Sequence, residues 1–284
     1  MHVQTEPGLP GGHARQVAAG ERFRFGENWS RFLEKLDDRR IAQAEASLRA
    51  MLGVSDLRGR SFLDVGSGSG LFSLAARRLG ARVHSFDFDP RSVACTAELR
   101  RRYFADDPSW TVEPGSVLDT EYLKRLGHFD VVYSWGVLHH TGAMWQSLAN
   151  VAPLVGDGGL LFIAIYNDQG TASRRWLAVK RTYNRLPSAL RFLVLWPVFV
   201  QQFWRPIVKD LFKGQPLASI RQHGQDRGMD MWRDHVDWVG GLPFEVAKPE
   251  QIFDFYRERG FELYRLVTQG GSLGCNEFVF RKAN

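Results

Sequence analysis

The chain has 284 residues, of which 44% are hydrophobic and 24% are charged, and it carries a formal net charge of +6 at pH 7. This composition is ordinary for one globular domain with an insertion, or for two small domains. The two cysteines, Cys95 and Cys275, lie far apart and have no metal-ligand spacing, which argues against a disulfide framework and favours the reducing cytoplasm.

The first segment of the chain, residues 1–20, contains glycine, proline and histidine but no apolar core. We therefore expect a mobile tail there and not a signal peptide. From Glu21 onward, apolar residues recur at helical spacing and predict two helices within residues 21–56. Asp37 and Asp38 precede the second helix, where negative charge suits a helix N-terminus.

Residues 62–79 predict a buried strand, a glycine-rich loop and a helix in that order. The loop contains Gly66, Ser67, Gly68 and Gly70, and glycine allows both a sharp turn and close approach of a ligand to backbone N–H groups at a helix start. A strand, a glycine loop and a helix open the nucleotide site of doubly wound α/β folds.

The spacing of these glycines narrows the class of ligand. The third glycine comes one residue too early for a dinucleotide fingerprint, and Leu71 stands where that pattern needs glycine. No Lys-Ser or Lys-Thr pair follows, which excludes a Walker-type phosphate loop. Asp64, two residues before the first glycine, suits a ligand that carries an ammonium group and no phosphate.

A second acidic residue, Asp87, ends the next predicted strand, residues 82–87. A ribose-binding carboxylate is expected at this place after a glycine loop, and Phe88 beside it can cover an adenine ring. Asp89 and Pro90 are typical of a helix N-cap and first turn. A helix-start role is the alternative for Asp87 as well.

Two further segments follow the third and fourth predicted strands: VEPGSVLD at residues 112–119 and FDVVYSWGVLHHT at residues 129–141. With the D-x-G-x-G-x-G pattern at residues 64–70 and the acid at Asp87, they resemble the motifs of the class I S-adenosylmethionine-dependent methyltransferases. The resemblance covers roughly residues 55–165. Within that family, the chain is similar to the ubiquinone-biosynthesis O-methyltransferase group.

The resemblance implies S-adenosylmethionine as cofactor, S-adenosylhomocysteine as product, and a Rossmann-like seven-stranded sheet closed by an antiparallel hairpin. The family's N-terminal helices lie over the cofactor and wall the acceptor pocket, which implies substrate contact by Trp29. Many relatives carry Asp where Ser116 stands, so the adenine contact stays open. The implied cofactor-binding residues are Asp64, Gly66, Ser67, Gly68, Gly70, Asp87, Phe88, Ser116, Val117, Ser134 and Trp135.

Strands and helices alternate through residues 57–166, which predicts an α/β core with a parallel sheet covered on both faces. Residues 156–159 predict a turn before a fifth strand at 160–165. Residues 250–284, with a helix at 250–259 and strands at 261–268 and 277–281, complete this core. Ligands of such sheets bind outside the carboxyl ends of the strands. That rule places Asp64, Asp87, Ser116, Trp135, His139, His140 and Tyr166 at the site.

Residues 167–249, between the fifth strand and the last helix, are too many for a loop and predict an inserted, mainly helical cap over the substrate. Residues 171–213 contain nine Lys and Arg residues and one Asp, a formal charge of +8. Within them, residues 189–200 are apolar almost all round but too short and too proline-broken to span a bilayer, which needs about 20 apolar residues.

Three explanations of this basic, apolar stretch stay open. It can pack inside the cap, form a homodimer contact, or make peripheral membrane or lipid contact over residues 189–213. Nucleic-acid binding is less favoured, because a basic patch is only an electrostatic footprint and no RNA-binding module adjoins the core.

The second half of the cap, residues 227–245, mixes Trp, His, Asp and Gly densely, as loops over binding sites do. We expect Trp232 and Trp238 to clasp a planar or apolar acceptor. His235 or Asp237 is a candidate base or orienting acid. The alternative is a loop whose Asp and His side chains satisfy one another and the backbone.

Methyl transfer from a sulfonium is an in-line displacement, so the positioning of two reactants supplies much of the rate. A hydroxyl acceptor must lose its proton, and histidine is the natural proton acceptor near neutral pH. His139 and His140 follow the fourth strand, and we favour His140 as the base. Tyr166 and Asn167 at the end of strand five would orient the acceptor oxygen.

The sequence therefore predicts a cytoplasmic or membrane-associated methyltransferase for a small, lipophilic or aromatic acceptor, with methylation at oxygen. No cluster of His, Cys and carboxylates has metal-ligand spacing, so we expect no metal. N-methylation of a small amine or amino sugar, RNA methylation, and cofactor binding without turnover are the alternatives.

Overall fold

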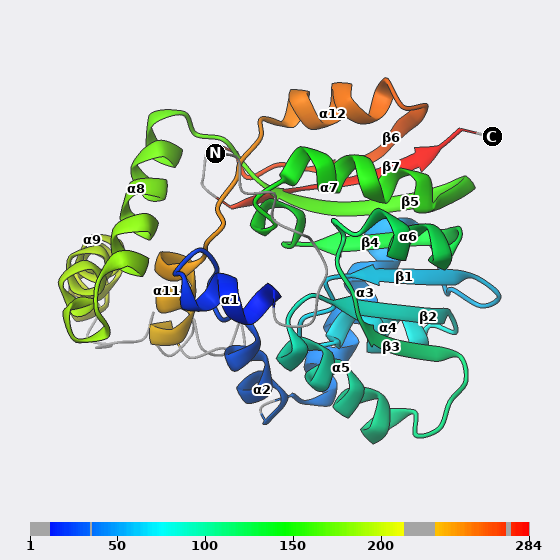
Figure 1. Cartoon of the computed structure of the whole chain (residues 1–284), viewed down its shortest axis with the longest axis horizontal. Coiled ribbons are helices and arrows are strands. Elements are labelled where there is room, and N and C mark those ends of the chain that lie inside the picture. Colours follow the sequence, from blue (N-terminus) through cyan, green and yellow to red (C-terminus); the bar gives the residue numbers. More distant parts are fainter. Residues whose placement is uncertain (1–11, 35, 213–230, 271–273, 284) are drawn as a thin grey trace.

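The computed structural model describes residues 12–34, 36–212, 231–270 and 274–283. Its centre is a seven-stranded sheet in the order β3-β2-β1-β4-β5-β7-β6 (Figure 1). The first five strands are parallel, whereas β7 pairs antiparallel with both β5 and β6. The strands are β1 (Ser61–Val65), β2 (Arg82–Asp87), β3 (Trp110–Pro114), β4 (Phe129–Trp135), β5 (Val155–Tyr166), β6 (Phe261–Val267) and β7 (Cys275–Lys282). The predicted doubly wound sheet with its closing hairpin is confirmed.

Helices cover both faces of the sheet because neighbouring strand residues are buried on opposite sides. Phe62 packs in a core with residues of α3 (Asp38–Leu52), α4 (Leu71–Arg78) and α5 (Pro90–Tyr103). Leu63 packs in a second core with residues of α6 (Thr120–Leu126), α7 (Met144–Val151) and α12 (Pro249–Arg257). The carboxyl ends of the parallel strands are left uncovered by these helices, so a ligand can reach them.

Local capping explains where two of these helices begin. The Asp37 side chain accepts a hydrogen bond from the Arg40 backbone N–H at 2.9 Å and caps α3, in line with its predicted acidic start. Asp89 caps α5 by accepting from the Arg91 backbone N–H at 2.9 Å, and Pro90 occupies the first turn. The predicted N-cap at Asp89 is confirmed.

Two predicted segments differ from the structure. Residues 12–18 of the expected mobile tail form helix α1 (Gly12–Ala18), and residues 1–11 lie outside the described residues. The predicted turn at residues 156–159 lies inside β5 instead. Val155 already pairs with Phe129, Leu160 pairs with Val131, and the glycines between them form an irregularity in a continuous strand. Glycine-rich sequence therefore marked a bulge and not a strand boundary.

The segment between β5 and α12 contains the helices α8 (Thr171–Arg185), η3 (Ser188–Leu190), α9 (Phe192–Phe212) and α11 (Met231–Gly240). Figure 1 shows α8, α9 and α11 at the same end of the sheet as α1 and α2 (Gly26–Glu34). A separate small core joins Tyr183, Leu195, Val198 and Val239. Helix α9 runs through Pro197, where we expected a break. None of the described helices has the length and apolar character needed to cross a membrane.

Candidate active site

A cavity of about 1080 Å³ lies at the carboxyl ends of β1, β2, β4 and β5. Residues of α1, α2, α8 and α11 complete its wall, so the N-terminal helices and the cap both cover it. Small-molecule sites commonly measure about 300–1,000 Å³. The cavity is therefore large enough to hold two small ligands side by side.

The glycine loop forms one end of this cavity, and its conformation requires glycine. Gly66, Gly68 and Gly70 have φ angles of 80°, 55° and 79°, in the left-handed region that side chains disfavour. A Cβ atom at Gly66 would stand 2.4 Å from the Val137 side chain, and one at Gly68 would stand 3.2 Å from the Trp29 ring. The loop is thus closely covered from both sides.

Asp87 holds the glycine loop in place. One carboxylate oxygen accepts the Gly68 backbone N–H at 2.9 Å, and the other accepts the Asp89 backbone N–H at 2.8 Å. Burial raises the pKa of Asp87 to about 6, although both hydrogen bonds oppose this. Each carboxylate oxygen can accept a further hydrogen bond, so the side chain can bind a pair of hydroxyl groups as well.

Asp64 also lines the cavity, in a hydrogen-bonded network that reaches across the sheet. Its carboxylate accepts from the Ser73 hydroxyl, which lies 2.7 Å from the Ser85 hydroxyl, and the Trp110 indole N–H donates to Ser85 at 3.0 Å. Burial raises the pKa of Asp64 to about 7. A cation placed beside it would favour the ionised carboxylate.

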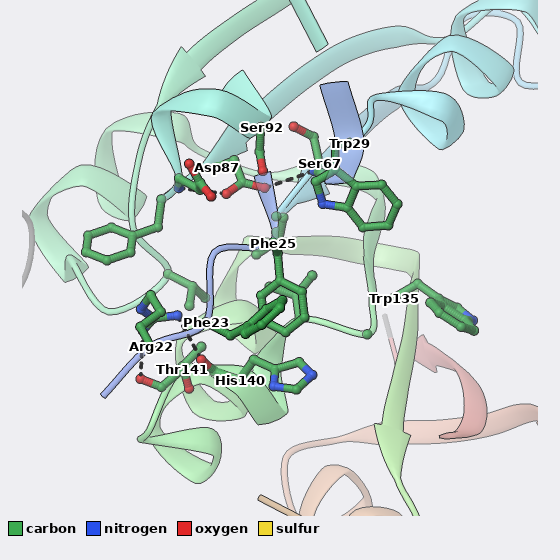
Figure 2. Close-up of a pocket in the computed structure, with 18 of the residues that line it drawn as sticks. Arg22, Phe23, Phe25, Trp29, Ser67, Asp87, Ser92, Trp135, His140 and Thr141 are labelled. Atoms are coloured by element: carbon green, nitrogen blue, oxygen red, sulfur yellow. Dashed lines mark hydrogen bonds between the residues drawn. The ribbon is translucent and has the colours of Figure 1, made fainter. Parts of the chain in front are cut away.

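His140 occupies the far side of the cavity from Asp87, next to Phe25 (Figure 2). Its Nδ1 lies 2.5 Å from the Pro243 carbonyl oxygen, which can only accept, so the proton is on Nδ1. Among the described residues, Nε2 has no hydrogen-bond partner and keeps its lone pair. Burial lowers the pKa of His140 to about 3, so the ring is neutral at physiological pH.

Arg22 joins these two sides of the cavity, and the sequence did not point to it. Its Nη1 donates to the His140 carbonyl at 2.9 Å (Figure 2). Its Nε donates to the Gln16 side chain at 2.7 Å. The guanidinium carbon lies 5.2 Å from the centre of the Phe88 ring. Burial lowers the pKa of Arg22, and the nearby Asp87 and Asp89 oppose that shift.

The comparison with protein families settles the class of enzyme. Residues 63–161, which run from β1 into β5, match the family model for a methyltransferase domain. The chain therefore contains a methyltransferase domain, and its seven-stranded sheet has the fold of the class I S-adenosylmethionine-dependent methyltransferases. S-adenosylmethionine is the cofactor that this fold implies.

Solved structures share the fold of this methyltransferase at low sequence identity. Magnesium protoporphyrin IX methyltransferase from Synechocystis PCC 6803, with bound S-adenosylhomocysteine, aligns with a TM-score of 0.51 and 15% identity over 95% of this chain and 93% of that one. N-methyltransferase NodS from Bradyrhizobium japonicum WM9 gives 0.50 and 15% over 95% and 96%. An O-methyltransferase family protein from Burkholderia thailandensis gives 0.52 and 13% over 87% and 58%. At these identities the similarity concerns the fold alone.

The side chains at the glycine-loop end of the cavity have the chemistry needed to bind S-adenosylmethionine. Two carboxylates, Asp64 and Asp87, can accept from an ammonium group and from ribose hydroxyls, and Phe88 presents an aromatic ring. The predicted cofactor-binding residues that line the cavity are Asp64, Gly66, Ser67, Gly68, Asp87, Phe88, Ser116, Val117 and Trp135.

Two predicted cofactor-binding residues are not brought to the cavity. The Ser134 hydroxyl donates to the Val65 carbonyl at 3.0 Å, inside the sheet of the methyltransferase. Gly70 starts α4, and a Cβ atom there would stand 2.8 Å from the Thr96 Cα atom on α5. Both residues therefore support neighbouring elements.

His139 does not line the cavity either, contrary to its prediction as a candidate catalytic residue. Its ring is 1% exposed and lies 4.0 Å from the Tyr166 ring and 4.5 Å from the His140 ring, centre to centre. Burial lowers the pKa of His139 well below its usual range. Its place beneath the two cavity residues makes it a packing partner of both.

Aromatic rings form the opposite end of the cavity. Tyr166 and Trp238 line it as predicted, and Phe25 and Trp176 join them. The Trp238 ring centre lies 5.6 Å from that of Tyr166 and 5.4 Å from that of Trp176. Trp176 could not be predicted from the sequence, because no local pattern distinguishes the cavity-lining side of a basic helix from its other sides.

The remaining predicted residues have different places. Trp29 lies over the glycine loop, away from His140 (Figure 2). His235 lines the cavity, and its Nε2–H donates to the Leu195 carbonyl of α9 at 3.0 Å. Asn167 is 6% exposed, does not line the cavity, and bonds the Gly274 carbonyl through its backbone N–H at 3.0 Å. The side chains of Trp232 and Asp237 lie outside the described part of the structure.

Metal chemistry has no evident place among the described residues. None of their His, Cys, Asp and Glu side chains form a group of three or more that could hold a metal ion. Cys95 and Cys275 are both buried, and neither forms a disulfide bond.

Proposed function

We propose that this methyltransferase methylates a hydroxyl oxygen of a small, planar, largely apolar acceptor, with His140 as the general base. The observation that carries the proposal is the tautomer of the His140 ring. Because the Pro243 carbonyl fixes the proton on Nδ1, Nε2 presents a lone pair on a residue that lines the cavity. A neutral imidazole held in one tautomer can take a proton without first losing one.

The residues of the glycine-loop end would hold the cofactor. Asp64 would accept from its ammonium group and Asp87 from its ribose hydroxyls, while Phe88 would cover the adenine ring. When bound, S-adenosylmethionine supplies a methyl group on a positively charged sulfur and leaves as S-adenosylhomocysteine. His140 Nε2 would accept the acceptor's hydroxyl proton as the oxygen gains the methyl group. Arg22, which donates to the His140 carbonyl, would hold His140 in a fixed position relative to the cofactor-binding end of the cavity.

The aromatic end supports the choice of acceptor. Tyr166, Trp176 and Trp238 present rings whose centres lie within 5.6 Å of a neighbour, and such rings stack well on a flat apolar molecule. A phenol or quinol combines a planar ring with the hydroxyl that needs a base. This acceptor class agrees with the sequence resemblance to the ubiquinone-biosynthesis group.

One observation favours N-methylation as the second candidate. A base with a pKa of about 3 is weak, and burial is the cause of that low value. A neutral amine attacks through its own lone pair and loses its proton afterward, so it does not require a strong base. An amine acceptor is therefore compatible with the same cavity.

Paired acceptors and a His140→Ala variant test the proposal. Purified protein is given S-adenosylmethionine with phenols and quinols, or with the matching anilines, and formation of S-adenosylhomocysteine is measured. We expect turnover of hydroxyl acceptors, and a loss of about 100-fold or more in His140→Ala, because general-base catalysis contributes about 10²–10⁴-fold. Cofactor affinity, measured by calorimetry, should not change.

His84→Ala is the matched control, because His84 bonds Glu113 at 3.1 Å and does not line the cavity. It should keep full turnover. Preference for the anilines, with little effect of His140→Ala, would establish the second candidate and overturn the first. A larger loss in His235→Ala than in His140→Ala would assign the base to the cap.

A further inference from the structure

Helix α9 exposes large apolar side chains along one side. Leu193, Trp196, Val200 and Trp204 are 56%, 54%, 55% and 49% exposed, and we call these four residues the α9 outer face. Their spacing of three, four and four residues keeps them on one side of a helix. Phe192, Val208 and Phe212 are also exposed. A continuous apolar surface of this kind marks an interaction site.

The opposite side of α9 packs on the rest of the cap. Leu195 and Val198 are 7% and 8% exposed and join the small core with Tyr183 and Val239. The Leu195 carbonyl accepts from the cavity residue His235 at 3.0 Å. The helix is therefore anchored on its inner side, while about half of each side chain in the α9 outer face is exposed.

The positive charge of α8 and α9 favours an anionic partner. Their exposed charged residues are all basic: Arg174, Arg175, Arg181, Arg185 and Lys209. The sole acidic residue of either helix, Asp210, is 6% exposed. Basic residues near a membrane are attracted to anionic lipids, by about 1 kcal/mol each close to the surface.

The charge of α8 and α9 argues against a second copy of the chain as the occupant of the face. A two-fold contact would bring two basic helix pairs together, because the same surface faces itself. A lipid interface needs only an apolar helix side with polar surroundings, and tryptophan is enriched there.

We propose that the α9 outer face docks on the surface of a lipid bilayer that contains anionic lipids. Helix α9 lies in the plane of that surface, with Trp196 and Trp204 inserted at the boundary between the headgroups and the acyl chains. With 21 residues, it extends about 31 Å along the bilayer. The docking does not depend on which acceptor is methylated. It places α8 and α11, which carry the cavity residues Trp176 and His235, next to the membrane.

Vesicle co-sedimentation of the full chain tests the proposal. The probes are vesicles of phosphatidylcholine mixed with phosphatidylglycerol, and vesicles of phosphatidylcholine alone. We expect binding to the mixed vesicles to be stronger by about tenfold or more, because several basic residues contribute. Added salt should weaken it by screening those charges.

The double variant Trp196→Glu/Trp204→Glu should lose vesicle binding by about tenfold or more, because two charges replace the inserted rings. Its cofactor affinity should stay normal, which shows that the protein is folded. The matched control is Trp145→Glu/Leu266→Glu, in which two residues that are each 40% exposed elsewhere on the protein receive the same charges. This control should bind vesicles like the unaltered protein.

Three results would overturn the proposal. The first is no binding of the unaltered protein to the mixed vesicles. The second is equal binding to both kinds of vesicle, which removes the role of anionic lipid. The third is a dimer in sedimentation equilibrium that Trp196→Glu/Trp204→Glu dissociates while vesicles stay unbound, which assigns the α9 outer face to a second copy of the chain.

Discussion

The two ends of the cavity are held in different ways. At the glycine-loop end, Asp87 fixes the Gly68 and Asp89 backbone N–H groups, and a Cβ atom at Gly66 would have no room beside Val137. At the aromatic end, Tyr166 and Trp238 meet through ring contacts at 5.6 Å. Directional hydrogen bonds admit one geometry, whereas rings can slide and repack. The glycine-loop end therefore suits a constant cofactor, and the aromatic end suits acceptors that vary.

This comparison predicts steep losses for changes at the glycine-loop end and shallow ones at the aromatic end. The largest effect is expected for Gly66→Ala. Alanine at position 66 must adopt a left-handed backbone conformation, and its Cβ atom must displace the Val137 side chain. We expect these two effects together to lower cofactor affinity by about 100-fold or more in calorimetric titration. Gly127→Ala is the control, because Gly127 has a φ of 74° but nothing within 4 Å of its Cβ position. Near-normal affinity in Gly66→Ala would show that the loop is not rigid.

Asp87→Ala comes next. This substitution removes the carboxylate that holds Gly68 and lines the cavity. The loss of two charge-assisted hydrogen bonds costs about 2–3 kcal/mol in total. The affinity for S-adenosylmethionine should therefore fall roughly 30- to 150-fold. Asp119→Ala is the control, because Asp119 caps α6 through the Tyr122 backbone N–H at 2.9 Å and lies outside the cavity. It should lower the unfolding free energy by about 1 kcal/mol and leave affinity unchanged. Equal affinity in both variants would reduce Asp87 to a helix-start residue.

The pH dependence of cofactor binding sharpens the same comparison. Asp64 has a raised pKa of about 7 in the ligand-free protein, so it is largely protonated in mild acid. A bound ammonium group favours the carboxylate, so binding releases a proton and affinity rises with pH. We expect a gain of about tenfold from about pH 6 to about pH 8, measured by calorimetry in buffers with different ionisation enthalpies. Asp64→Asn should remove this dependence, and a persistent slope in that variant would assign the proton elsewhere.

The smallest effect is expected at the aromatic end. Trp238→Leu keeps an apolar surface but loses ring contacts worth about 0.5–1.5 kcal/mol, so the KM for the acceptor should rise about three- to tenfold. Cofactor affinity should stay the same in the same preparation. Trp145→Leu, at a surface tryptophan of α7, should change neither value. A loss of cofactor affinity in Trp238→Leu as large as that in Asp87→Ala would contradict the division into two ends.

The sequence predicted the parts of the fold whose cause is local. The strand, glycine loop and helix at residues 61–78, and the N-cap at Asp89, follow from hydrophobic period and capping chemistry within a few residues. The start of β5 was missed, because pairing of Val155 with Phe129 overrides a glycine-rich stretch that favours a turn. Helix α1 was missed because it packs on Phe88, far along the chain.

The site shows the same limit. Asp64 and Asp87 could be found because each stands at a fixed distance from the glycine loop along the chain. Arg22 could not, because its bond to His140 joins residues 118 positions apart. The roles of His139 and His140 could not be separated either, since the Pro243 carbonyl that sets the tautomer of His140 comes from the cap. Tertiary contacts decide which of two adjacent histidines meets a ligand.

Helix α1 also matters for how the protein is shortened in practice. Polar, glycine-rich N-terminal segments are often removed from proteins before crystallisation, and the sequence alone would suggest a truncated protein that begins at residue 21. Such a cut would delete the Gln16 side chain that bonds Arg22 and the His13 ring that contacts Phe88. The shortened protein would keep every motif of its class while one wall of the cavity was missing. Low activity of the shortened protein would then be a result of the truncation and would not reflect the activity of the full-length enzyme.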